Sequence, residues 1–311
     1  MMNTSHPASS FTPLSLSQSY NGGHIVFRLL RCSGWGPELM NFGYFPRRGF
    51  LALPANMLVL LSRRQFRLAS EAIGHLDVQP GDDVIDIACG RGGASYIIKC
   101  STEAARVTGV DLLAENIQLA KNMFPRLDGL DFVEGDAQSL PMEDGSVSRA
   151  LCCEAAFHFP DKARFIREAA RVLKPGGRLV VVDFVWTSAA CREHRGHEFA
   201  QHIRDIWHMD DLFTAQEYRS AGEAAGLRLV REIDWTDHVT RPLQEIFEAN
   251  VWLAQRTWGR RLLYDFQPLT RNFSDADWDA VAYSARAHRF MVPLTRYKVM
   301  VFDKPLSRHA L

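Results

Sequence analysis

Short apolar runs alternate with amphipathic runs through the middle of the chain. Five runs rich in Val, Ile and Leu and closed by Gly, Asp or Glu predict buried strands at 84–88, 106–111, 131–134, 149–153 and 179–184. Between them lie helical patterns, of which the clearest starts at the N-cap Asp161 and runs to Lys174, before Pro175. Because strands that alternate with crossover helices form parallel sheets, we expect a sheet covered by helices on both faces.

The pattern changes after the fifth strand. Residues 186–213 are rich in His, Arg, Asp and aromatic residues, and a helix at 214–225 and a strand at 228–234 follow. Residues 240–290 have helical character, and 295–303 resemble a final strand. The sequence therefore predicts an α/β fold with a doubly wound, Rossmann-like, mostly parallel seven-stranded sheet and helical lid insertions.

These segments divide the chain into four parts. We expect a disordered tail at 1–18, an N-terminal helical arm or lid at 19–69, a core at 70–235 and 295–305 with the inserted segment 186–213, and a helical cap insertion at 236–294. The cap is rich in aromatic residues. We expect most of these aromatic residues to pack in the core of the cap and a few to close an apolar pocket. They are Phe247, Trp252, Trp258, Tyr264, Phe266, Trp278 and Tyr283.

Composition narrows the range of partners. The chain has 311 residues with 36 basic and 36 acidic side chains, so we expect no nucleic-acid partner, which would favour a basic surplus. The longest apolar stretch, 49–61, is interrupted by Pro54 and is too short to span a membrane. The 6 cysteines have no zinc-site spacing, which favours reduced thiols in a cytoplasmic protein and no metal site. Whether the protein forms a homo-oligomer is left open.

A glycine-rich turn follows the first predicted strand, at Gly90, Gly92 and Gly93. Glycines let the backbone approach a ligand closely, and the helix that starts after them offers free N–H groups to an anion. Dinucleotide-binding enzymes share such a turn, so an NAD-dependent oxidoreductase is an alternative. Ser95, however, stands where the third glycine of the dinucleotide pattern would be.

Two acidic residues at strand ends and one further segment extend this motif. Asp111 closes the second strand, Asp136 follows the third, and Arg171-Val172-Leu173-Lys174-Pro175-Gly176-Gly177-Arg178-Leu179 leads into the fifth. With the glycine turn, this set resembles the class I S-adenosylmethionine-dependent methyltransferase family over about residues 70–235. The segment Met40-Asn41-Phe42-Gly43-Tyr44-Phe45 resembles one found in tocopherol- and sterol-type C-methyltransferases.

The resemblance implies S-adenosylmethionine as the cofactor and assigns roles by position. Gly90 and Gly92 would face its methionine part, Asp111 would hold the ribose, and Leu112 would pack on the adenine. Asp136 and Ala137 would read the adenine edge, and Tyr44 would lie near the sulfonium. The full set of expected cofactor-binding residues is Tyr44, Asp86, Ala88, Gly90, Gly92, Asp111, Leu112, Asn116, Asp136 and Ala137. Ala88 stands where the family often has glycine, a departure that adds only a methyl group.

The methyl acceptor should bind at the carboxyl ends of the strands. Glu154 and His158, which follow the fourth strand, resemble a Glu and a His of the sterol and tocopherol relatives and are the candidate catalytic bases. Phe157, Trp207 and His208 are the candidate substrate-binding residues. The expected reaction is methylation of a small, largely apolar metabolite, with an alkene, prenyl or aromatic carbon favoured over oxygen or nitrogen. We expect a role in secondary metabolism.

Overall fold

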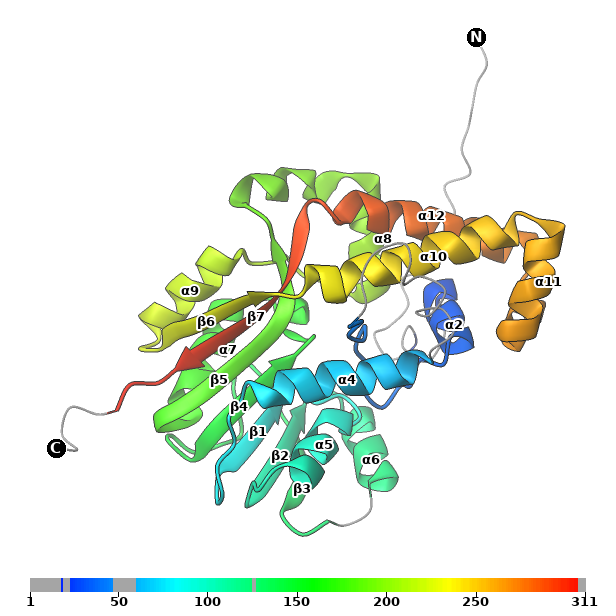
Figure 1. Ribbon diagram of the computed structural model, residues 1–311. Helices are drawn as coiled ribbons and strands as arrows, with labels where there is room; N and C mark the ends of the chain where they lie inside the picture. Colours follow the sequence, from blue (N-terminus) through cyan, green and yellow to red (C-terminus); the bar gives the residue numbers. More distant parts are fainter. Residues whose placement is uncertain (1–17, 19–22, 47–59, 125–126, 307–311) are drawn as a thin grey trace.

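The computed structural model describes Gln18 and residues 23–46, 60–124 and 127–306. Nearly all of the expected tail 1–18 and of the apolar stretch 49–61 lies outside these residues. Seven strands form one sheet in the order β3-β2-β1-β4-β5-β7-β6 (Figure 1). Their bounds are Asp83–Ile87 (β1), Arg106–Asp111 (β2), Leu130–Glu134 (β3), Val147–Cys153 (β4), Leu173–Trp186 (β5), Arg228–Asp234 (β6) and Thr295–Asp303 (β7).

The sheet is mostly parallel. Strands β1 to β5 pair in parallel, whereas β7 is antiparallel to both β5 and β6 and lies between them. The predicted α/β fold class is therefore confirmed. Strand β5 extends beyond the predicted run 179–184 at both ends, because Leu173 pairs with Val147 and Trp186 pairs with Thr295.

Helices cover both faces of the sheet. Because successive strand residues point to opposite faces, Val180 and Val182 pack in the core that includes Leu68 of α4, whereas Val181 packs with Phe165 of α7. Asp161 caps α7 by accepting the N–H of Arg164, as its sequence position predicts. The helices next to the sheet are α4 (Leu61–Gly74), α5 (Gly93–Ser101), α6 (Ala114–Met123), α7 (Lys162–Val172) and α9 (Ala215–Ala224).

The remaining helices lie beyond the carboxyl end of β5. Helices α10 and α12 run side by side away from the sheet, α8 packs on α12, and α11 lies at their far end (Figure 1). These helices are α2 (Ile25–Cys32), α8 (Glu198–Trp207), α10 (Thr240–Ala254), α11 (Thr257–Phe266) and α12 (Asp275–Met291), with short 3₁₀ segments at Ala156–His158, Ala189–Gly196, Thr236–His238 and Pro268–Asn272. Within the described residues, no helix is long and apolar enough to cross a membrane.

Candidate active site

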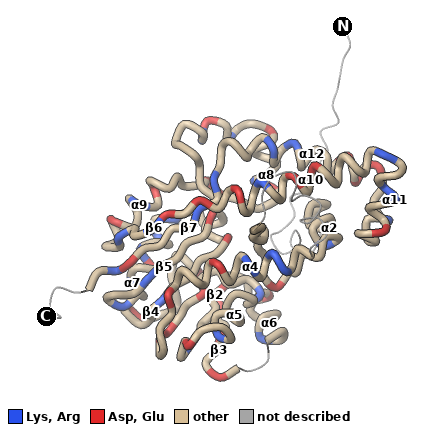
Figure 2. The backbone as a smooth tube through the Cα atoms, in the orientation of Figure 1, with Lys and Arg blue, Asp and Glu red and all other residues tan. Residues whose placement is uncertain are grey.

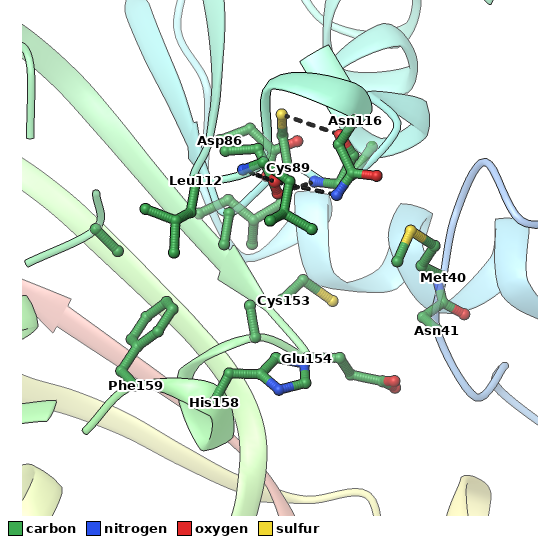
Figure 3. Close-up of a pocket in the computed structure, with 18 of the residues that line it drawn as sticks. Met40, Asn41, Asp86, Cys89, Leu112, Asn116, Cys153, Glu154, His158 and Phe159 are labelled. Carbon is green, nitrogen blue, oxygen red and sulfur yellow. Dashed lines mark hydrogen bonds between the residues drawn. The ribbon is translucent and has the colours of Figure 1, made fainter. Parts of the chain in front are cut away.

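A pocket lies at the carboxyl edge of the sheet, where β1, β2 and β4 end (Figure 3). Its volume is about 170 Å³. The crossover connections of a parallel sheet leave this edge open, because each strand turns here into the segment that leads to its next helix. Ten of the predicted site residues line the pocket: Asp86, Ala88, Gly90, Asp111, Leu112, Asn116, Asp136, Ala137, Glu154 and His158.

The turn between β1 and α5 is built in the left-handed backbone region. Ala88, Gly90 and Gly92 have φ of 56°, 55° and 81°. Gly92 is the N-cap of α5, and a Cβ there would come within 2.5 Å of the Phe132 ring. Gly92 therefore shapes the turn without lining the pocket, whereas Gly90 does line it.

Asp111 joins the end of β2 to this turn. Its Oδ2 accepts the N–H of Gly90 at 2.8 Å, and its Oδ1 accepts the N–H of Leu113 and the Nδ2–H of Asn116, each at 3.0 Å. Burial raises its pKa, although these donors act in the opposite direction. The carboxylate is thus fixed in orientation at the pocket wall and can accept hydrogen bonds from neighbouring hydroxyl groups.

Asp86 lies on β1 below the same turn. Ser95 Oγ donates to its Oδ2 at 2.6 Å, and burial raises the pKa of Asp86 to about 7. The serine that replaces the third glycine of the dinucleotide pattern is therefore a hydrogen-bond donor that ties α5 to β1. This role could not be inferred from the glycine spacing.

Two further lining residues, Leu112 and Asp136, follow the ends of β2 and β3. Leu112 is 64% exposed, which leaves a large apolar side chain uncovered beside the pocket. Asp136 Oδ1 accepts the N–H of Gln138 at 2.8 Å, and Ala137 is buried next to it.

Glu154 is the first residue after β4, and it is almost completely buried. Its Oε1 accepts the hydroxyl of Tyr297 at 2.5 Å, and the N–H of Phe42 lies 3.2 and 3.1 Å from Oε1 and Oε2. Burial raises the pKa of Glu154 to about 8, and the two donors counteract this effect. The carboxyl group is therefore held by segments from both ends of the chain, and its pKa lies close to neutrality.

His158 lies one short turn beyond Glu154, in the 3₁₀ segment Ala156–His158. Its Nδ1 is 3.0 Å from the carbonyl oxygen of His208, so the ring carries its proton on Nδ1. Burial lowers the pKa of His158 to about 4, which keeps the ring neutral at physiological pH. His208 thus contributes its backbone carbonyl, from the left-handed C-cap of α8, and its side chain does not line the pocket.

Three predicted aromatic residues, Tyr44, Phe157 and Trp207, lie outside this pocket. Tyr44 stacks on His238, with ring centroids 4.7 Å apart and an interplanar angle of 7°. Met40 and Asn41 of the same segment line the pocket instead (Figure 3). Phe157 is buried next to the pocket and packs against Phe184.

Trp207 lines a second, apolar cavity between α8, α10, α12 and the end of β5. Its indole N–H donates to His288 Nε2 at 3.0 Å, and its ring lies 4.5 Å from that of Phe42. This apolar cavity has a volume of about 50 Å³. Its walls are Phe42, Phe184, Ile203, Trp207, Met209, Leu212, Thr240, Leu243, Gln244, Phe247, His288, Met291, Val292 and Thr295.

A third, smaller gap beside the N-terminal segment shares lining residues with the strand-end pocket and with the apolar cavity. Glu154 lines both this gap and the pocket, and Phe42 and Trp207 line both the gap and the apolar cavity. Met40 and Asn41 also line both the gap and the pocket, so the pocket and the apolar cavity adjoin the same gap although they have no lining residue in common. Across the described part of the chain, no cluster of His, Cys, Asp and Glu could hold a metal ion.

The chain has recognisable relatives. Residues 85–181 match a family model described as a methyltransferase domain. The chain is 33% identical over 183 residues to phthiotriol/phenolphthiotriol dimycocerosates methyltransferase 1 of Mycobacterium ulcerans, which covers 58% of this chain and 62% of that protein. It is 32% identical over 182 residues to 2-methyl-6-phytyl-1,4-hydroquinone methyltransferase of Synechocystis, which covers 56% of each. The chain thus spans less than two thirds of these curated relatives.

A solved structure has the same fold. Geranyl diphosphate C-methyltransferase from Streptomyces coelicolor superposes with a TM-score of 0.62 at 20% identity, over 88% of this chain and 92% of that one. The sheet, the glycine turn and the family match identify a class I S-adenosylmethionine-dependent methyltransferase domain, whose cofactor is S-adenosylmethionine. Among methyltransferases, the similarity includes the tocopherol-type branch, as the sequence predicts.

Proposed function

We propose that this protein transfers a methyl group from S-adenosylmethionine to a small, largely apolar acceptor, at an alkene, prenyl or aromatic carbon. One observation carries the proposal: the buried carboxyl group of Glu154 lines the strand-end pocket and also the small gap that adjoins an apolar cavity. Such a cavity suits an apolar molecule, because none of the residues that line it is Asp, Glu, Lys or Arg. Methylation at oxygen or nitrogen of a small metabolite is the alternative.

The residues of the pocket fit the cofactor. When bound, S-adenosylmethionine supplies an electrophilic methyl group on a sulfonium. Asp111 would accept the ribose hydroxyls, since its carboxylate is already oriented by three donors. Leu112 would pack on the adenine, because its exposed side chain lies beside the pocket, and Asp136 would accept from the adenine amino group.

Glu154 would act as the base. An alkene carbon that has gained a methyl group leaves a positive charge on its neighbour, and the double bond re-forms when an adjacent C–H proton passes to a carboxylate. Tyr297 and the N–H of Phe42 orient the carboxyl of Glu154 for this transfer. Its raised pKa makes it a stronger base than an exposed glutamate. His158 is the second candidate base, because it is neutral and lines the same pocket.

The proposal includes the setting inferred from the sequence: a cytoplasmic enzyme of secondary metabolism. The relatives support an apolar acceptor, since one of them is a 2-methyl-6-phytyl-1,4-hydroquinone methyltransferase. We also retain the proposed division into arm, core and cap. In this division, residues 186–213 and the described parts of the arm, 23–46 and 60–69, close over the pocket and exclude water, and the rest of the arm lies outside the described residues.

The experiment is a methyl-transfer screen on the purified protein with isotope-labelled S-adenosylmethionine. The acceptor panel contains prenyl alcohols, prenyl diphosphates, phytyl hydroquinones, simple phenols and amines, and mass spectrometry locates the added methyl group. We expect label on carbon in a prenyl or aromatic member of the panel. Label on oxygen or nitrogen would support the alternative. Calorimetric binding of NAD in place of S-adenosylhomocysteine would overturn the proposal.

A further inference from the structure

Exposed apolar side chains concentrate at the far end of the cap. The exposed fractions are 48% for Trp252, 54% for Trp258, 41% for Leu262, 67% for Phe266 and 58% for Leu269. These residues belong to the end of α10, to α11 and to the 3₁₀ segment that follows. We call them the tip. The sequence-based expectation that most cap aromatics are packed in its core is therefore wrong for Trp252, Trp258 and Phe266.

The arrangement on α11 is that of a helix with one uncovered apolar side. Trp258, Leu262 and Phe266 are four residues apart, so they form a stripe along the helix, and Leu263 faces the cap interior and is buried. Figure 1 shows α11 beyond the ends of α10 and α12, where it projects from the body. Isolated exposed apolar residues are common, but a contiguous patch of this kind indicates a partner.

Arginines border the same patch. A shallow hollow between α10 and α11 is lined by Arg256, Arg260 and Arg261, together with Thr257 and Tyr264. The Arg256 guanidinium lies 3.8 Å from the Trp252 ring centroid. Residues 252–271 contain four arginines and a single acidic residue, Asp265, which lies 3.9 Å from Arg271. Arg260 pairs with Asp275 at 2.7 Å, so the net positive charge of the tip comes from Arg256 and Arg261. The tip is therefore locally basic although the chain as a whole has no net charge, as Figure 2 shows at the α10–α11 corner.

We propose that the tip binds the surface of an anionic phospholipid membrane. Trp, Leu and Phe side chains partition into the boundary between headgroups and acyl chains, and adjacent arginines attract lipid phosphates. A hydrophobic protein partner would not require the arginine-lined hollow, and a nucleic acid would not require the stripe. The tip attaches the protein to the surface, and it does not span the bilayer.

The position of the tip connects it with the apolar cavity. Leu243 and Phe247 line the cavity from α10, and Trp252 lies further along the same helix. Phe247 and Trp252 are separated by about 7.5 Å of helix at 1.5 Å per residue, so the near wall of the cavity would lie about one to two helix turns above the lipid headgroups. The protein could then take an apolar acceptor from the membrane. The binding itself does not depend on methyl transfer and can be tested without it.

The test is cosedimentation of the full chain with large vesicles of phosphatidylcholine alone or mixed equally with phosphatidylglycerol, at low and high salt. We expect binding to the anionic vesicles that high salt weakens, and little binding to phosphatidylcholine alone. Trp258→Ser should weaken binding at least tenfold, and Arg261→Gln about fivefold. Matched controls are Phe66→Ser on α4, where the phenylalanine is also 54% exposed, and Arg63→Gln, which should both bind as the unmodified protein does.

Tryptophan fluorescence gives an independent readout. On binding, emission should shift to the blue and be quenched by brominated acyl chains, and Trp258→Phe should reduce that quenching. Absence of binding to anionic vesicles at low salt would overturn the proposal, as would equal binding by Trp258→Ser. A third outcome would also overturn the proposal: the protein does not bind vesicles but self-associates, and Trp258→Ser abolishes the self-association. The tip would then bind a second copy of the chain.

Discussion

The buried carboxyl group of Glu154 allows a quantitative test of the proposed chemistry. Its pKa of about 8 means that about a tenth of the molecules carry the carboxylate at pH 7 and about nine tenths at pH 9. Only the carboxylate can accept a proton, so the turnover rate should rise about tenfold between these two pH values. An unperturbed glutamate would already be ionised throughout this range, and the rate would be flat.

Two substitutions test separately whether Glu154 is the base and whether Tyr297 sets its pKa in the pH–rate profile. Glu154→Gln removes the base and should lower turnover at least about a hundredfold and abolish the rise with pH. Tyr297→Phe removes a hydrogen bond that lowers the pKa of Glu154, so the midpoint of the profile should move to higher pH. Glu103→Gln, in an exposed position, is the control for the change of residue type and should leave the profile unaltered.

The assay measures initial rates of labelled methyl transfer at saturating donor and acceptor, with S-adenosylhomocysteine affinity determined by calorimetry on each variant. Cofactor affinity should change little in Glu154→Gln. If that variant instead loses the cofactor and keeps its turnover at saturation, Glu154 belongs to the cofactor site. A profile with a midpoint near pH 4 would transfer the role of base to His158, whose pKa is lowered to about 4.

Three further predictions concern the cofactor pocket, the glycine turn and the thiols. Asp111→Ala should weaken S-adenosylhomocysteine binding by about 2–3 kcal/mol in calorimetry, because hydrogen bonds to a charged group are lost. Gly92→Ala should lower the free energy of unfolding by about 2–4 kcal/mol in denaturant titration, through a positive φ and a clash with an aromatic ring. Gly145→Ala should cost only about 1 kcal/mol, since its φ is also positive but its Cβ would meet open space. In peptide mapping after maleimide treatment, exposed Cys100 should react well before Cys153, whose thiol pKa is raised well above its usual value by burial.

Local sequence patterns were sufficient for the sheet and for the edge at which the strand-end pocket lies. The strand ends predicted Asp111, Asp136 and Glu154 at one edge, because the carboxyl ends of parallel strands meet there. All three line the pocket. The pairing of β5 from Leu173 was not predicted, because Pro and Gly residues in that segment usually end a strand.

The residues that were misplaced or missed depend on tertiary packing. Tyr44 is turned towards His238, a contact between segments almost two hundred residues apart, and no local pattern indicates it. Tyr297, which bonds to Glu154, is separated from it by 143 residues. The exposure of Trp258 could not be predicted either, because helical spacing alone does not tell which apolar side is covered.

The position of β7 in the sheet also determines the order in which the protein can assemble. Strands β1 to β5 are contiguous in the chain and pair with one another, so this half can form while later residues are still being synthesised. Strand β6 has no partner until β7 enters between it and β5. Since β7 also brings Tyr297 to Glu154, the candidate base acquires this second donor, after the N–H of Phe42, only once β7 has entered the sheet.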